Sequence, residues 1–478
     1  LANLYFLCAS EFVNINNLLQ EDDSKLMFQH CLIKYKCELL DVVDGDIFTT
    51  DIPKITGILE NVIDSEVNQF LVNVWSYLKA IDRMVSDDTI YLNRMRPIWC
   101  KTSKKFDSKE FRLLFKTKNL IFGAIKDRAV KNKLSRGKIK TGFDIGQRIA
   151  DHLEKMIFYS EDLTRKIAIK SIDNTVDELL LAQGKNLAFA VAPIYYDFEY
   201  SFRRYKSFQG VPYVFEEIKN RKKIEEIITY ILKKCIEEDV HIVVFPELAI
   251  DVKLRDHIAN WLKRNNEEKK IIMVVAGSYH ILKNRRKKQY ENSCIVYRFD
   301  GQELWEQKKM NRFQLDQDDM NKIRNSNQKA FKDFKQLFKP PDKNGWEKIE
   351  ISDTLVINES SIGRMAVTIC LDYFVREKDK LLIESQINLV FLPSMSPSLK
   401  RMDISNIDLS TYAQTSVFCC NSCWIVTGAE KCNFNRDHSS FIYIPQKNGL
   451  MHMDCEAKCD CLKCNLKIFR ISQISGNF

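Results

Sequence analysis

Three kinds of side chain that suit covalent catalysis stand at the ends of short apolar runs. Glu247 follows the run HIVVFP at residues 241–246, and Cys370 follows Met365–Ile369. Lys308 and Lys309 end a segment in which Asp300-Gly301 predicts a turn between two strands. Because ligands bind at strand ends in open α/β sheets, we expect these side chains to share one site.

Together these side chains suit acyl transfer. A cysteine thiol with an ordinary pKa of about 8.5 is mostly protonated at neutral pH and needs a base. The carboxylate of Glu247 is suited to that role, and a nearby ammonium both favours the thiolate and stabilises the oxyanion of a tetrahedral intermediate. The sequence therefore predicts a covalent site on Cys370 without histidine, and we interpret all seven histidines as structural or surface residues.

The motifs around these residues resemble those of the nitrilase, or carbon–nitrogen hydrolase, superfamily over residues 186–450. The family's base motif is similar to Phe245-Pro246-Glu247-Leu248, and its nucleophile motif is similar to Ile369-Cys370-Leu371-Asp372. Three further landmarks occur in the family's order, namely Ala276-Gly277-Ser278, Glu291-Asn292-Ser293 and Leu392-Pro393-Ser394.

The resemblance implies a four-layer α-β-β-α sandwich, a homo-oligomer, and a hydrolase of small-molecule amides or nitriles that needs no cofactor for catalysis. Glu247 is then the general base, Cys370 the nucleophile, and the amide N–H of Leu371 an oxyanion donor. The family's lysine usually follows a Tyr-x-Lys pattern, from which this sequence departs, so Lys308 and Lys309 are both candidates and we favour Lys309.

The resemblance also implies further residues around the site. A second glutamate of the family corresponds to Glu347, or else to Glu350. Asp372 is a further catalytic candidate, but we favour a role in stabilising the turn after Cys370 or in supporting a residue of the site. Glu377 stands seven residues after Cys370, where the family often has Pro-Glu.

The region 185–478 alternates short β-rich runs with amphipathic segments, which is typical of an α/β fold with a largely buried sheet. We expect strands at residues 186–194, 240–245, 271–276, 293–299, 365–369, 387–392, 423–427 and 440–444, and helices at 214–238 and 252–264. The polar stretch 314–346 interrupts this alternation and is interpreted as an insertion over one rim.

Residues 1–180 favour an all-α region, because apolar residues recur at spacings of three and four, as in Phe70, Leu71, Val74 and Trp75. Within it, residues 101–140 hold 14 Lys/Arg against 3 Asp/Glu. Phe111, Leu114 and Phe115 continue the helical spacing there. This basic segment is either the solvated face of a helix, a nucleic-acid contact, or a contact for an acidic protein.

Four cysteines lie in the C-terminal stretch 452–464, namely Cys455, Cys459, Cys461 and Cys464. Thiolates at this density suit a tetrahedral structural zinc site, although a second C-x₂-C pair is absent from the stretch. The alternatives are unliganded thiols and a disulfide or other redox chemistry.

Composition excludes several protein classes. The chain has 478 residues, 45% hydrophobic and 29% charged, an ordinary globular balance. No apolar run approaches the roughly 20 residues that cross a bilayer, and the first residues show no signal peptide, so we expect a cytoplasmic protein with reduced thiols and no membrane partner.

A second interpretation makes this chain a nucleic-acid-associated defence protein. Some bacterial defence-associated reverse transcriptases carry a nitrilase-like domain at the C-terminus. The basic segment 101–140 before such a domain resembles that arrangement, with the domain as an effector or scaffold.

Overall fold

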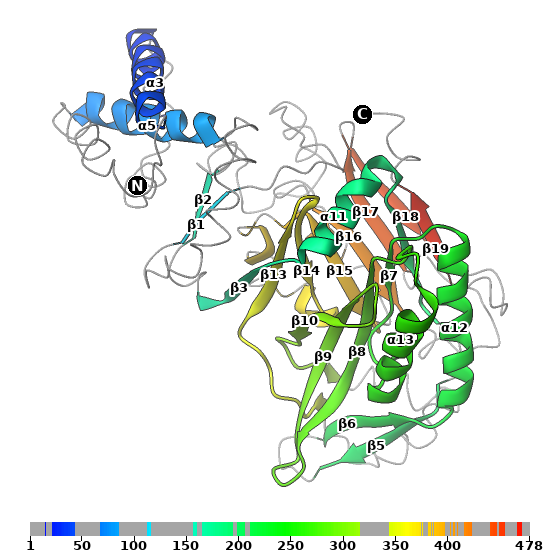
Figure 1. Cartoon of the computed structure of the whole chain (residues 1–478). Helices are drawn as coiled ribbons and strands as arrows, with labels where there is room; N and C mark the ends of the chain where they lie inside the picture. The colour runs from blue at the N-terminus through cyan, green and yellow to red at the C-terminus, as the bar shows by residue number, and fades with distance from the viewer. Residues whose placement is uncertain are drawn as a thin grey trace. The chain divides into compact units, whose positions relative to one another are not determined.

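The computed structural model (Figure 1) describes Ile15 and residues 22–43, 67–85, 112–115, 156–159, 165–194, 198–205, 211–315, 344–373, 375, 381–383, 385, 387–396, 402, 405–406, 409, 415–422, 440–446, 449–454 and 466–470. The chain divides into two compact units. The first comprises Leu1–Thr117 and Ser135–Arg165, and the second comprises Lys118–Leu134 and Lys166–Phe478. No described helix is both long enough and apolar enough to cross a membrane.

In the first unit, helices α3 (Asp22–Val43) and α5 (Val67–Val85) pack against each other. α5 buries Leu71, Val74, Trp75 and Leu78, whose spacing places them on one side of the helix. The Tyr35 and Tyr77 rings meet edge to face with centroids 5.7 Å apart. The predicted helix around residues 70–81 is therefore confirmed.

The basic segment contains a strand where a helix was expected. Strand β1 (Arg112–Phe115) pairs antiparallel with β2 (Met156–Tyr159), with Arg112 opposite Tyr159. The expected helix is wrong at Leu114 and Phe115, because a short apolar run fits both periods and its pairing partner lies far along the chain. Phe111 lies outside the described residues. The rest of residues 101–140 lies outside the described residues, so a nucleic-acid or acidic-protein contact there stays a prediction.

A six-stranded sheet forms the first β layer of the second unit. Its strand order is β10-β9-β8-β7-β4-β19. The strands are β4 (Ala188–Val191), β7 (Ile242–Val244), β8 (Met273–Asn284), β9 (Gln289–Arg298), β10 (Glu303–Lys308) and β19 (Lys467–Arg470). β4, β7 and the start of β8 run parallel, and β8, β9 and β10 form an antiparallel meander.

A seven-stranded sheet forms the second β layer, in the order β18-β17-β16-β15-β14-β13-β3. The strands are β3 (Ile167–Ser171), β13 (Leu355–Ser360), β14 (Gly363–Val367), β15 (Leu389–Ser394), β16 (Ser416–Asn421), β17 (Phe441–Gln446) and β18 (Gly449–Asp454). The expected strand at residues 423–427 lies outside the described residues.

Residues 166–180 belong to the second unit, although the sequence placed them in the N-terminal helical region. β3 pairs in parallel with β13 and forms the edge of the seven-stranded sheet. Helix α11 (Asn174–Gln183) follows, with Asp173 as its N-cap, and the short 3₁₀ helix η2 (Gly184–Asn186) leads into β4. Val176 and Leu180 of α11 are buried in the core that the two sheets share.

The two sheets pack face to face around that core. Phe189 of β4 stacks on Phe418 of β16 with ring centroids 4.2 Å apart. Met273, Val275, Met365 and Phe391 join the same buried cluster from both sheets. β4, β7 and the start of β8 are buried on both faces, because one face packs on the other sheet and the opposite face packs on helices. Both sets of alternating positions are therefore apolar, which explains why these runs are almost continuously hydrophobic.

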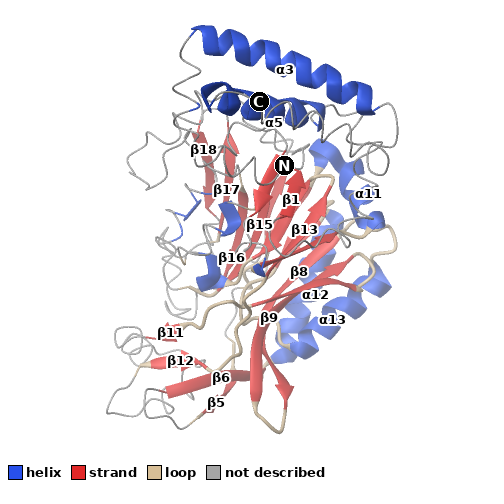
Figure 2. Cartoon of the chain, turned by 90° about the vertical axis from the view of Figure 1, so that its left-hand side faces the viewer, coloured by secondary structure: helices blue, strands red, loops and turns tan. Residues whose placement is uncertain are grey.

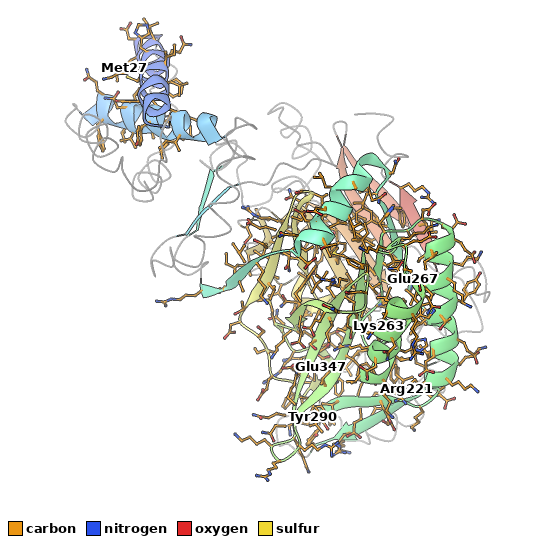
Figure 3. All side chains as sticks on the ribbon, in the orientation of Figure 1. Met27, Arg221, Lys263, Glu267, Tyr290 and Glu347 are labelled. Carbon is orange, nitrogen blue, oxygen red and sulfur yellow. The ribbon has the colours of Figure 1, made fainter. Side chains whose placement is uncertain are left out.

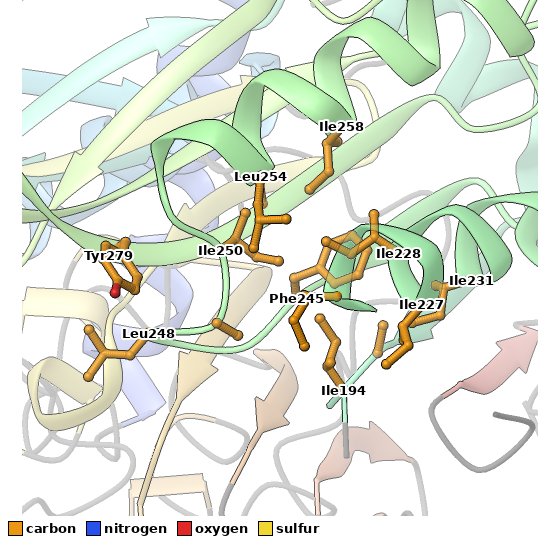
Figure 4. Close-up of a cluster of buried hydrophobic side chains, with 14 of the residues drawn as sticks. Ile194, Ile227, Ile228, Ile231, Phe245, Leu248, Ile250, Leu254, Ile258 and Tyr279 are labelled. Carbon is orange, nitrogen blue, oxygen red and sulfur yellow. The ribbon is translucent and has the colours of Figure 1, made fainter. Parts of the chain in front are cut away.

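Helices α12 (Arg221–Glu237) and α13 (Val252–Asn265) cover the outer face of the six-stranded sheet (Figure 2). Figure 4 shows Ile227, Ile228 and Ile231 of α12 and Leu254 and Ile258 of α13 around Phe245. After β14, residues 381–383, 402, 405–406 and 409 are helical and buried. The predicted mixed α/β sandwich is confirmed.

A smaller four-stranded sheet adjoins the β8–β9 hairpin, in the order β11-β12-β6-β5. Its strands are β5 (Tyr200–Arg204), β6 (Val211–Ile218), β11 (Gln314–Leu315) and β12 (Gly345–Glu347). The helix expected over 214–238 is therefore wrong in its first part, since residues 214–218 pair with β5. An amphipathic strand running into an amphipathic helix gives one uninterrupted pattern, which hid the boundary at Asn220. Of the expected insertion 314–346, residues 316–343 lie outside the described residues.

Candidate active site

Glu247 emerges from the loop directly after β7. Leu248 N–H donates to Ser278 O at 2.7 Å, and Glu247 and Ser278 form a parallel bridge, so the loop is held against β8. Gly277 has φ +62°, and a Cβ there would lie 2.2 Å from Pro246 O. Only glycine therefore lets β8 approach the Pro246-Glu247 turn this closely.

Lys309 follows β10 and lies inside the molecule. Its backbone N–H donates to Asn292 O at 2.7 Å, which extends the pairing of β10 with β9 by one residue. Lys308 points the other way, because successive side chains alternate across a strand. Its side chain is 44% exposed and pairs with Glu291 at 2.7 Å, whereas the side chain of Lys309 is 1% exposed.

Glu347 lies at the end of β12 and completes a buried charged cluster. Lys309 Nζ lies 2.8 Å from Glu247 Oε1 and 2.8 Å from Glu347 Oε2. Glu347 Oε2 also accepts from Phe313 N–H at 2.8 Å. The other candidate, Glu350, is exposed. Figure 3 labels Glu347 along the β8–β9 hairpin, with Tyr290 farther toward its tip.

Two residues that sequence reasoning gave no site role also contact these carboxylates. Asn292 Nδ2 donates to Glu247 Oε1 at 3.2 Å. His280 Nε2 lies 3.0 Å from Glu347 Oε1, although the sequence left every histidine as structural or surface. Asn292 stands in a landmark motif and is findable from it, whereas His280 carries no signal beyond its place on β8.

Cys370 begins the 3₁₀ helix η4 (Cys370–Tyr373) just after β14. Its φ of 47° lies in the left-handed region, which is strained for a residue with a Cβ and is typical of functional turns. Ser394 Oγ, at the end of β15, lies 3.6 Å from Cys370 Sγ. Leu371 is partly exposed in the same turn. The strand-turn geometry expected for a presented thiol is present.

Asp372 joins the two sides of the site. Its Oδ2 accepts from Met310 N–H at 2.9 Å, and its Oδ1 accepts from Asn311 Nδ2 at 2.9 Å. The turn that carries Cys370 is thereby tied to the loop that carries Lys309. Glu377 lies outside the described residues.

Burial and neighbouring charges shift the pKa values of Lys309 and Glu347 in opposite directions. Burial lowers the pKa of Lys309, but the carboxylates of Glu247 and Glu347 outweigh it and raise the pKa well above its usual value. Burial likewise raises the pKa of Glu347, but Lys309 and His280 overcome it and bring the pKa to about 2. The cluster therefore holds one ammonium against ionised Glu347 at neutral pH.

Burial raises the pKa values of the two titratable groups in the Cys370 turn. Burial, with the charge of Glu247, raises the pKa of the Cys370 thiol, while Lys309, Ser394 and the Met395 N–H act against this rise. Burial also raises the pKa of Asp372 to about 7, against the opposing effect of Lys309. The thiol is therefore protonated at neutral pH, and a base must remove its proton.

Metal binding is not indicated within the described part of the chain, where no group of three or more His, Cys, Asp or Glu side chains is arranged to hold an ion. Cys455, Cys459, Cys461 and Cys464 lie outside the described residues, so the structural zinc stays a prediction.

Comparisons with known proteins give matches in structure but not in sequence. No model of a protein family matches the chain, and no curated protein matches it. Nit3 of Saccharomyces cerevisiae, a member of branch 10 of the nitrilase superfamily, is 13% identical with a TM-score of 0.35, covering 57% of this chain and 90% of Nit3. An amidase from Nesterenkonia sp. is 12% identical with a TM-score of 0.35, covering 57% of this chain and 90% of the amidase.

A third similar structure is a longer protein. It is the glutamine-dependent NAD+ synthetase from Acinetobacter baumannii, 16% identical with a TM-score of 0.36, covering 59% of this chain. The match covers 45% of the synthetase, so this chain corresponds to less than half of that protein. Nitrilase-superfamily structures are thus among the structural neighbours of the chain.

Proposed function

We propose that this chain hydrolyses the C–N bond of small non-peptide amides through a thioester on Cys370. The observation that carries the proposal is the buried contact of Lys309 with both Glu247 and Glu347, linked through Asp372 to the turn that presents Cys370. A buried ammonium between two carboxylates beside a protonated thiol supplies a base, an electrophilic group and a nucleophile.

The first step forms the carbon–sulfur bond. Glu247 removes the Sγ proton as sulfur attacks the amide carbonyl carbon, which gives a tetrahedral oxyanion. Lys309 uses two of its three N–H donors on Glu247 and Glu347, so the third is left for the oxyanion. The amide N–H of Leu371 is the second donor in this proposal.

The second step breaks the carbon–nitrogen bond. Glu247 returns the proton to the leaving nitrogen, which departs as ammonia from a primary amide, and the acyl group remains on Cys370 as a thioester. Within the described part of the chain, the hydrogen bonds to the Glu247 carboxylate, from Lys309 and Asn292, both fall on Oε1. We therefore assign the proton transfers to Oε2.

The third step restores the enzyme. Glu247 takes a proton from water as the water oxygen attacks the thioester carbonyl. The carbon–sulfur bond then breaks, the proton returns to Sγ, and the carboxylic acid leaves. Glu347 takes no part in bond making and acts by holding Lys309 in place.

The test is ammonia release from a panel of short primary amides, measured for the wild type, Cys370→Ala and Cys235→Ala. Cys235 is a buried thiol on α12 and serves as the matched control. We expect turnover by the wild type and Cys235→Ala and none by Cys370→Ala. Equal turnover by Cys370→Ala would remove the basis of the proposal.

A further inference from the structure

The contacts of His280 connect the charged cluster to the four-stranded sheet. His280 lies on β8 and its side chain is fully buried. Its Nδ1 accepts from the backbone N–H of Phe215, on β6, at 2.9 Å. Its Nε2 lies 3.0 Å from Glu347 Oε1. The Phe215 and His280 rings also meet edge to face with centroids 5.5 Å apart.

These two contacts assign the tautomer of the ring. A backbone N–H always donates, so Nδ1 must present a lone pair to Phe215. The remaining ring proton then resides on Nε2 and donates to Glu347. A doubly protonated ring is incompatible with this network, because its Nδ1–H would face the Phe215 N–H.

Every partner of Glu347 is consequently a donor. Oε2 accepts from Lys309 Nζ and Phe313 N–H, and Oε1 accepts from His280. Among the described residues, His280 is the hydrogen-bond partner of Glu347 Oε1, so its removal leaves a buried charged oxygen unsatisfied. Such a loss is costly, and it favours rotation of the carboxylate away from Lys309.

A neutral donor has a specific advantage here. The groups that face Lys309 are Glu247 after β7, Glu347 on β12 and Cys370 on η4, with Asp372 acting from the same turn. A cationic donor on Glu347 would compete with Lys309 for that carboxylate. Neutral His280 satisfies Oε1 and leaves the attraction between Glu347 and Lys309 undivided.

We infer that His280 is a positioning residue for the amide hydrolysis: its Nε2–H fixes Glu347, and Glu347 in turn fixes the Lys309 ammonium that faces the oxyanion. This inference rests on the proposed function for its kinetic consequence. The contact itself can be tested without turnover.

Two conservative variants separate the two bonds of His280. Asparagine places its carbonyl oxygen near the position of Nδ1, so His280→Asn keeps the acceptor for Phe215 and loses the donor to Glu347. Glutamine places its amide nitrogen near the position of Nε2, so His280→Gln keeps the donor and loses the acceptor. A purely structural role in anchoring β6 predicts that asparagine is the better replacement, whereas the positioning role predicts glutamine.

The experiment measures kcat and KM for a primary amide against pH in the wild type and both variants. We expect His280→Asn to lower kcat on the order of 10- to 100-fold with little change in KM, because Lys309 moves from its place near the reacting oxygen. The acid limb of its kcat profile should move to higher pH, since the lost donor had favoured ionised Glu347. His280→Gln should stay within about threefold of the wild type. The opposite ranking overturns the inference.

Two measurements keep this test separate from the proposed function. Long-range ¹H–¹⁵N spectra at pH 8 should show His280, assigned by its loss in both variants, with the proton on Nε2. Alkylation of Cys370 by iodoacetamide should be slower in His280→Asn than in the wild type, because Lys309 stabilises the thiolate. If the wild type hydrolyses no amide, the proposed function fails. An Nδ1–H tautomer, or equal alkylation rates in the wild type and His280→Asn, overturns the inference.

Discussion

The two sides of the site hold their reactive groups by different means. On the side of the six-stranded and four-stranded sheets, Lys309 is fixed by two charged hydrogen bonds of 2.8 Å to carboxylates that are themselves anchored. On the side of the seven-stranded sheet, Cys370 is fixed by a tight turn with φ 47°, and its thiol has a long contact of 3.6 Å with Ser394. The first side is held by electrostatics and the second by backbone geometry.

Because of this difference, mutations on the two sides should have different kinds of effect. Charged contacts in a buried cluster depend on pH and on every partner, whereas a backbone turn depends on neither. Asp372 belongs to both sides, because it stands in the Cys370 turn and accepts hydrogen bonds from the Met310–Asn311 loop. Changes on the Cys370 side should therefore abolish turnover with little effect on stability. Changes on the Lys309 side should alter turnover, stability and pH dependence together.

The largest effect is expected for Cys370→Ala. Without the nucleophile, turnover should fall by a factor on the order of 10⁴ or more. The melting temperature should change little, because the turn is set by the backbone and alanine removes one sulfur. Ammonia release and thermal unfolding of the wild type, Cys370→Ala and Cys235→Ala measure this. A large loss of stability would show that the thiol itself holds the turn.

Lys309→Met should lower kcat on the order of 10²-fold or more, the scale of a lost oxyanion donor. Lys308→Met is the matched control, since Lys308 is partly exposed and pairs with Glu291 on the other side of the strand. We expect the control to retain kcat within about twofold, because Lys308 pairs with Glu291 outside the Glu247–Lys309–Glu347 cluster, and Glu291 keeps a second ion pair with Lys283 at 2.6 Å. Equal losses in both variants would contradict the assignment of Lys309.

The difference between these lysines shows where sequence reasoning ends. The alternation of strand residues puts Lys308 and Lys309 on opposite faces, but a sequence does not say which face is inside. The β9–β10 register and the Asn292 contact decide it. Glu247 and Cys370 were predictable because each directly follows an apolar strand in a specific motif.

Other parts of the site were beyond the sequence for a physical reason. His280 and Phe215 are 65 residues apart, and their bond depends on how the four-stranded sheet docks on β8. Residues 214–218 of β6 were expected to be helical, so the sequence could not indicate that the Phe215 N–H donates to a neighbouring strand. Contacts between separate sheets leave no periodic pattern in either segment.

Glu347→Gln tests the electrostatic side through stability. The pKa of Glu347 lies near 2 in the folded chain, below its ordinary value of 4.5, so its stabilising contribution is present above pH 4.5 and is lost as pH falls toward 2. The variant should be less stable than the wild type at pH 7, on the order of 3–5 kcal/mol for a broken buried pair. Denaturant unfolding at several pH values should show that gap closing below about pH 4. A gap independent of pH would contradict the ion pair.

Asp372→Asn should have a smaller effect on stability than Glu347→Gln, and this effect should depend on pH in the opposite direction. The folded pKa of Asp372 is raised to about 7 from an ordinary 3.8, so its contribution is full below pH 3.8 and is lost as pH rises through about 7. The wild type should therefore lose stability relative to the variant between these pH values. Urea unfolding of both proteins at pH 5 and pH 8 measures this, and a constant difference between them would show that Asp372 does not titrate in that range.

The smallest effect on turnover is expected at the C-terminal cysteines, because the proposed chemistry uses no metal. If Cys455, Cys459, Cys461 and Cys464 bind zinc, purified chain should carry about one metal ion. Cys461→Ser/Cys464→Ser should lose it while kcat stays unchanged. Elemental analysis of protein prepared without chelators decides this, and metal-free wild type would leave the four thiols unliganded or redox-active.

The central claim is that Cys370 carries the acyl group. The direct measurement is mass spectrometry of wild-type chain quenched in acid during turnover of a primary amide, followed by peptide mapping. The claim predicts an acyl adduct, the mass of the amide less ammonia, on the peptide that contains Cys370, and its removal by hydroxylamine. Sustained ammonia release with Cys370 unmodified, or an adduct on another residue, would contradict it.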